Sequence, residues 1–181
     1  SNFGKMASGE RKGGGGIESY LEGLFLISTG DEKYMPVVRE FARQDAKKPG
    51  STSAWGNGFR GIFLGEYYLA TGDKAILPGL KAVVDAAVAT QYYGGWSHGG
   101  CNPGYVTSGL VNAAGVQCFD SLVIARECGV NVPQHAYDDA LRQHYRFAGT
   151  GSVPYGDHYP EMWWSSNGKN GGLAAGLILL P

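Results

Sequence analysis

The chain lacks the features that mark several common classes of protein. Its 181 residues contain only three cysteines, too few for a disulfide framework and without the close spacing of a zinc motif. No apolar run approaches the roughly 20 residues that span a bilayer. The formal net charge is −1, and lysine and arginine never cluster beyond pairs. We therefore expect no metal or other cofactor, no nucleic-acid partner and no membrane partner.

Long alternation of apolar and polar residues is also missing, which argues against confident strands. Helical spacing is abundant instead. Ile17, Tyr20, Leu21 and Leu24 predict a helix that is buried on nearly all sides, and the apolar stripe from 34 to 42 predicts an amphipathic second helix. The sequence therefore predicts an all-α protein.

The sequence predicts two similar helical hairpins. The turn of each contains the tripeptide Thr-Gly-Asp, at residues 29–31 and at 71–73. Gly30 and Gly72 can take the left-handed conformation that ends a helix. Asp31 and Asp73 can accept the free N–H groups that begin the next helix. These four residues are therefore predicted to be structural joints.

A third hairpin is expected from a helix between about Thr107 and Cys128, which ends at Gly129, and a partner at 137–148 with Asn131 and Pro133 near its start. A seventh helix should begin near Lys169 and run to Leu180. Stacked hairpins of this kind predict an α/α-toroid. A ring of six hairpins needs about 270 residues, so the chain should hold about three hairpins and one further helix, an incomplete ring.

The domain prediction is a disordered tag or linker at 1–14 and a single α/α-toroid domain, or part of one, at 15–181. The apolar helix at the C-terminal end has no evident mate. Two alternatives would cover it: a second copy of the chain in a homodimer, or the remainder of a longer protein. The native location stays open, with export to the periplasm or outside the cell as one alternative.

Three loops rich in glycine and aromatic residues, at 53–58, 94–102 and 154–161, are unlike surface linkers. In a toroid such loops gather at one end of the ring, so we expect a rim where distant residues converge. The candidate catalytic residues are His98, Asp157, His158 and Glu161, because imidazole titrates near neutrality and a carboxylate can orient it or act as an acid.

The candidate ligand-binding residues are of two kinds. Aromatic side chains can stack on sugar rings or line an apolar cavity, and amides and a lysine at a helix N-terminus can hold an anion. The residues are Trp55, Trp96, Tyr105, Tyr155, Asn167, Lys169 and Asn170. The structural alternative is that the histidines brace glycine-rich turns, that the aromatics belong to the core, and that Asn170 caps a helix.

Three stretches, at 65–73, 95–99 and above all 153–158 followed by 167–170, resemble an uncharacterised bacterial family with an α/α-toroid. The resemblance runs from about Gly15 to Leu180 and implies a fold without a mechanism. Residues 91–96 are similar to the repeats of terpenoid cyclases and protein prenyltransferases, with Trp96 one position early. The acid motif of those cyclases and the zinc ligands of those transferases are absent.

Carbohydrate-active α/α barrels are similar in their Thr-Gly-Asp turns, and this likeness implies that Asp157 or Glu161 would act as the acid. Three functions therefore stand side by side. The first is a toroid domain whose rim binds a carbohydrate or other small molecule. The second is an enzyme, of the hydrolase or lyase kind, that uses Asp157 or Glu161 with a histidine. The third is a structural or oligomerisation module.

Overall fold

The computed structural model describes residues 16–99, 109–147, 149, 153–156 and 169–179. Over these ranges the protein is helical, which confirms the all-α prediction, and no strand is present beyond two isolated bridges. The α-helices are α1 (Ile17–Ser28), α2 (Met35–Asp45), α3 (Ala54–Thr71), α4 (Leu77–Ala89), α5 (Asn112–Glu127), α6 (Gln134–Tyr145) and α7 (Lys169–Ile178).

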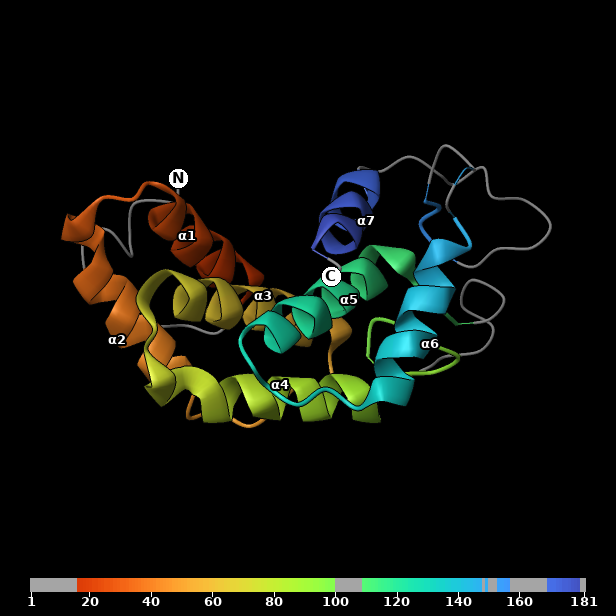
Figure 1. Ribbon diagram of the computed structural model, residues 1–181, viewed down its shortest axis with the longest axis horizontal. Helices are drawn as coiled ribbons and strands as arrows, with labels where there is room; N and C mark the ends of the chain where they lie inside the picture. Colours follow the sequence, from red (N-terminus) through yellow and green to blue (C-terminus); the bar gives the residue numbers. More distant parts are fainter. Residues whose placement is uncertain (1–15, 100–108, 148, 150–152, 157–168, 180–181) are drawn as a thin grey trace.

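The odd-numbered helices form an inner row, and the even-numbered helices lie along its outer side (Figure 1). Within the row, α3 packs against α1 and α5, and α5 packs in turn against α7. The α3–α5 contact is the most extensive in the described part of the protein. These two helices are therefore the centre of the fold.

Glycines on α3 allow this close approach. A Cβ at Gly58, Gly61 or Gly65 would collide with side chains of α5. Residues 58, 61 and 65 lie on one face of a helix, and their small size lets the two backbones come together. The many glycines of the sequence thus serve helix packing as well as turns.

The two Thr-Gly-Asp joints have the predicted geometry. Gly30 has φ +64° and Gly72 has φ +67°, the left-handed region that glycine occupies without strain. The Asp31 carboxylate accepts from the Lys33 N–H at 3.0 Å, and the Asp73 carboxylate accepts from the Ala75 N–H at 3.2 Å. Each joint leads into a short 3₁₀ turn, Glu32–Tyr34 or Lys74–Ile76, before the next α-helix begins.

Three local predictions are wrong. Residues 54–58 are the first turn of α3 and not a loop, because the Ser53 hydroxyl accepts from the Gly56 N–H and caps the helix there. The helix α5 begins at Asn112 instead of 107, since the Val111 N–H is bonded to the Trp96 carbonyl at 2.7 Å. Third, α6 spans Gln134–Tyr145 instead of 137–148, although Pro133 at its N-cap position and Asn131 lie near its start as predicted.

The helix α1 is also less buried than predicted. Leu21 is 40% exposed and Phe25 is 57% exposed. The reason is its position at one end of the inner row, where α3 is its neighbour in that row (Figure 1). The side of α1 turned away from α3 therefore presents apolar side chains.

Candidate rim site

Three of the predicted site residues come together at one place in the structure. Trp55 lies in the first turn of α3, His98 follows α4, and Tyr155 belongs to the segment at 153–156. The Trp55 indole Nε1 donates to His98 Nδ1 at 2.6 Å, and His98 Nε2 lies 3.0 Å from the Tyr155 hydroxyl. These contacts join residues 43 and 57 positions apart in the chain. We call this triplet the rim cluster.

The hydrogen bonds of the rim cluster fix the tautomer of His98. An indole N–H can only donate, so Nδ1 of His98 must be the acceptor. The ring proton then lies on Nε2, which donates to the oxygen of Tyr155. Protonation of Nδ1 would remove the acceptor and break the bond to Trp55. The cluster is thus built around a neutral imidazole.

Backbone hydrogen bonds anchor the rim cluster to the N-terminal ends of α3 and α5. The Ala54 N–H donates to the His98 carbonyl at 3.0 Å, and the Ala113 N–H donates to the Tyr155 carbonyl at 3.2 Å. The Asn112 side chain adds a bond to the Pro154 carbonyl at 3.2 Å. This is the end of the inner helices opposite the Thr-Gly-Asp joints, where the sequence places the rim.

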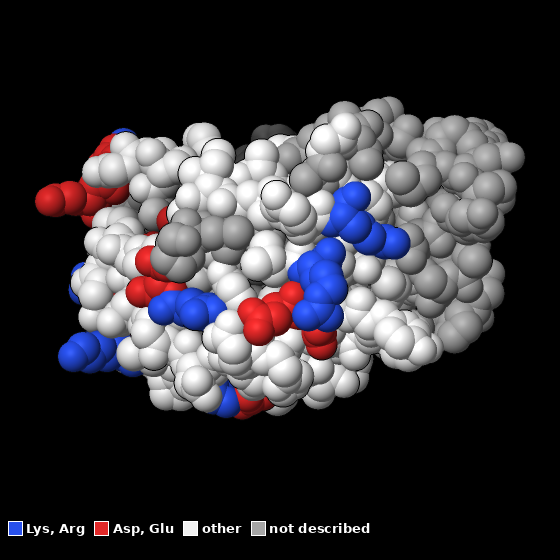
Figure 2. Space-filling view, turned by 45° about the vertical axis from the view of Figure 1, so that its right-hand side comes forward, with Lys and Arg blue, Asp and Glu red and all other residues white. Residues whose placement is uncertain are grey.

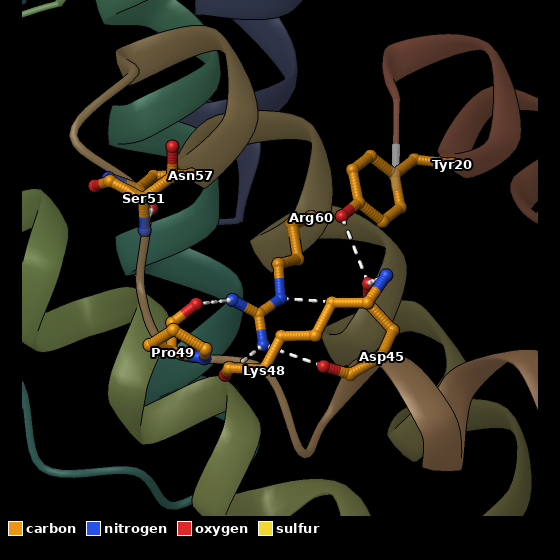
Figure 3. A network of polar contacts seen from close by, with 7 residues as sticks. All are labelled: Tyr20, Asp45, Lys48, Pro49, Ser51, Asn57 and Arg60. Carbon is orange, nitrogen blue, oxygen red and sulfur yellow. Dashed lines mark hydrogen bonds and ion pairs between the residues drawn. The ribbon is translucent and has the colours of Figure 1, made fainter. Parts of the chain in front are cut away.

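A buried polar network behind the rim fixes the loop that leads into α3 (Figure 3). Arg60 Nε donates to the Asp45 carboxylate at 2.7 Å. The other guanidinium nitrogens of Arg60 bind the backbone carbonyls of Pro49 at 2.6 Å and of Asp45 and Lys48 at 2.8 Å. Tyr20 and Lys48 complete the coordination of the Asp45 carboxylate at 3.1 and 2.9 Å. We call these four side chains the Asp45 network.

A second set of hydrogen bonds joins Asn57 to the same loop, closer to the rim. The Asn57 side chain exchanges two hydrogen bonds with the backbone of Ser51, at 2.9 and 2.7 Å. These bonds hold the loop directly before Ser53, the residue that caps α3. Trp55 is thus positioned by a rigid loop on one side and by the start of a helix on the other.

The other predicted site residues lie elsewhere. Trp96 is 1% exposed and its Nε1 donates to the Ala87 carbonyl at 2.8 Å, so it belongs to the core and not to the rim surface. The remaining predictions fall outside the described residues, namely Tyr105, Asp157, His158, Glu161 and Asn167. Lys169 and Asn170 begin α7, but their side chains are outside the description.

No group of three or more His, Cys, Asp or Glu among the described residues could hold a metal ion. Two of the cysteines are buried thiols on or next to α5. Burial raises the pKa of Cys118 and raises that of Cys128 to about 11, with nearby acidic charges as the lesser cause for Cys128. A thiol with a raised pKa is a poor nucleophile, so these two cysteines act as core residues.

A hollow of about 540 Å³ lies at the other end of the inner helices, beside the Thr-Gly-Asp joints. Ile27, Met35 and Thr71 line it, together with the oppositely charged side chains of Glu32 and Arg39. Sequence analysis did not predict a cavity there. On the face of the molecule drawn in Figure 2, acidic and basic side chains lie side by side over the described residues.

A set of buried polar atoms without a hydrogen-bond partner among the described residues was not predicted from the sequence. They are Gln117 Oε1, Asp120 Oδ1, Gln143 Nε2 and His144 Nε2. All four belong to α5 or α6. One signal was available in the sequence, because Asp120 stands as a single charge in the apolar run between Val116 and Ile124.

No helix in the described part of the chain is both long and apolar enough to cross a membrane. No curated protein and no solved structure matches the sequence. One family does match, over residues 6–180, and its description is a domain of unknown function, DUF6288. Since the match covers nearly the whole sequence, the chain belongs to the DUF6288 family.

Proposed function

We propose that this domain is an arc of an α/α-toroid whose rim binds a small polar molecule, with a carbohydrate as the leading class. The observation that carries the proposal is the rim cluster, in which an indole, an imidazole and a phenol from three segments meet. Flat aromatic rings beside polar donors and acceptors suit the apolar faces and hydroxyl groups of a sugar. The inner and outer rows of helices in Figure 1 support the toroid arrangement.

The contacts of the rim cluster hold its aromatic rings in fixed orientations and do more than fill space. Trp55 and Tyr155 are partly exposed, and the ring planes of Trp55 and His98 are nearly parallel, 19° apart, with their centroids 6.0 Å apart. The bonds that hold His98 use both ring nitrogens, so the imidazole has one fixed orientation. A ligand would therefore meet a surface that is already arranged, which lowers the entropic cost of binding.

Binding of neutral oligosaccharides to the full chain tests this proposal, with saturation-transfer NMR on a panel of xylo-, cello- and chito-oligosaccharides. We expect Trp55→Phe and Tyr155→Phe to weaken binding by tenfold or more, because each removes a polar atom of the rim cluster. The matched control is Tyr145→Phe, which changes an exposed tyrosine of α6. Equal binding by all three variants, or no binding to any member of the panel, would contradict the proposal.

The enzyme alternative also involves the rim. His98 and Tyr155 form a pair of titratable side chains within hydrogen-bond distance, an arrangement that can transfer a proton. The roles of Asp157, His158 and Glu161 in such chemistry stay predictions. The expected result is that Asp157→Asn leaves the circular dichroism spectrum unchanged and abolishes turnover of any glycan that the domain cleaves.

The oligomerisation alternative draws on the two ends of the inner row. Leu21 and Phe25 are exposed on α1, and Ile178 is 80% exposed on α7. Apolar side chains grouped on a surface often mark contacts with another chain. Light scattering at high concentration tests this function, and a strictly monomeric protein would count against a homodimer.

A further inference from the structure

The carboxylate of Asp120 is buried where α5 and α7 meet. Asp120 is 7% exposed, and its Oδ1 is buried without a hydrogen-bond partner among the described residues. Burial of an ionised carboxylate without a partner is strongly unfavourable. Ionisation of this carboxyl group is therefore disfavoured as long as the packing around Oδ1 is kept.

The helix α7 provides much of this burial. Gly176 of α7 sits directly on Asp120 Oδ1, because a Cβ at that position would collide with the oxygen and with the ring of Phe119. Gly172, one turn earlier, lies against Val116 and faces the other carboxylate oxygen. The approach is so close that no water molecule fits between Oδ1 and the helix. Only displacement of α7 would let water reach Oδ1.

No described charge compensates Asp120. Burial is the one cause that raises its pKa, to about 7 from 3.8. The described residues of α7 from 171 to 179 contain no titratable side chain. On α5 itself the Cys118 thiol donates to the Ala54 carbonyl, and the Asp120 charge is a lesser cause of the raised pKa of this thiol. The described titratable groups on the neighbouring helices act elsewhere: His144 stacks on Phe119, Glu66 acts on Cys128, and Lys81 pairs with Asp85.

We propose that Asp120 is a pH-sensitive switch for α7: the helix docks on α5 while the carboxyl group is protonated and leaves it when the group ionises. Release would uncover Asp120, Val116 and Phe119 at one end of the inner row. The proposal goes beyond ligand binding at the rim and does not depend on it, since neither the rim cluster nor the Asp45 network contacts this carboxylate.

The direction of the pH effect follows from proton linkage. Between about pH 4 and pH 7 the docked state holds a proton that the released state has lost, so a rise in pH favours release. The docking equilibrium should weaken by up to about tenfold for each pH unit in that window, and then stay constant above about pH 7. Below about pH 4 both states are protonated and docking is strongest.

Hydrogen exchange of the full chain, followed by mass spectrometry from pH 4 to pH 8, tests the switch. After correction for the intrinsic exchange rate, peptides covering 171–179 should lose protection as pH rises, while peptides from α3 should not. In Asp120→Asn the protection of α7 should be independent of pH. Asp138→Asn, at an exposed position on α6, is the matched control and should behave like the wild type.

Two further measurements keep the proposal open to refutation if Asp120→Asn does not fold. In Gly176→Ala the new Cβ would collide with Asp120 and Phe119, so α7 should lose its protection from hydrogen exchange at every pH. The protection of α3 should be unchanged. The carboxyl carbon of Asp120, followed by NMR in the wild type, should titrate well above the usual range for aspartate. An ordinary titration midpoint, or α7 protection with the same pH course in wild type and Asp120→Asn, overturns the proposal.

Discussion

The protein buries two aspartates in opposite ways. Asp45 is fully buried and its carboxylate meets Arg60, Lys48 and Tyr20. Asp120 is almost as buried, and its Oδ1 has no hydrogen-bond partner in the described part of the chain. A paired charge fixes a loop, whereas an unpaired charge makes its own surroundings sensitive to pH. The comparison shows that burial alone does not tell a structural carboxylate from a responsive one, because the partners decide.

The largest expected effect on stability comes from removing a partner of the paired Asp45. Arg60→Met leaves Asp45 without its guanidinium and leaves three backbone carbonyls without their donor. Removal of one member of a buried ion pair costs about 3–5 kcal/mol. Urea unfolding should show a loss of this size. A loss below about 1 kcal/mol would mean that the Asp45 network does not stabilise the fold.

Substitution of the unpaired Asp120 should change the stability of the protein in the opposite direction. Asp120→Asn removes a charge that burial disfavours, so it should stabilise the protein by up to about 4 kcal/mol at pH 8 and by less than about 1 kcal/mol at pH 4. The wild type should lose stability as pH rises from about 4 to 7, because the raised pKa keeps the folded state protonated longer than the unfolded state. Thermal unfolding at several pH values measures this slope. Identical slopes in the two proteins would contradict the assignment.

The smallest expected effect separates the partners of Asp45 from one another. Lys48 is 44% exposed, so its bond to the buried carboxylate is screened by water. Lys48→Met should therefore cost less than about 1 kcal/mol in urea unfolding. If Lys48→Met lowered the free energy of unfolding as much as Arg60→Met, the Asp45 network would act as one unit. The solvent exposure of a member would then not decide how much it contributes.

Helix positions could be predicted because they depend on local patterns. The Thr-Gly-Asp joints were predicted in detail, since a glycine C-cap and an aspartate N-cap act within a few residues. The start of α3 was missed because residues 54–58 contain glycines that sequence rules assign to a loop. One of them, Gly58, is used instead for contact with α5, a partner that is distant in sequence.

The candidate site was predictable only in part. The sequence singled out Trp55, His98 and Tyr155 by composition, and the structure brings them together. It also singled out Trp96, which the structure places in the core, because an aromatic residue looks the same in sequence whether it packs or binds. Arg60 and Asp120 were missed, since their importance depends on what surrounds them.

The sequence by itself determined the helices, their joints and the segments rich in glycine and aromatic residues, because caps and apolar spacing act over one or two turns. Only the tertiary structure decided which charges are paired. Tyr20, Asp45 and Arg60 meet through the packing of α1, α2 and α3, and Asp120 is isolated by the packing of α7 on α5. The physical reason is that solvation and pairing depend on neighbours in space, which local sequence patterns do not contain.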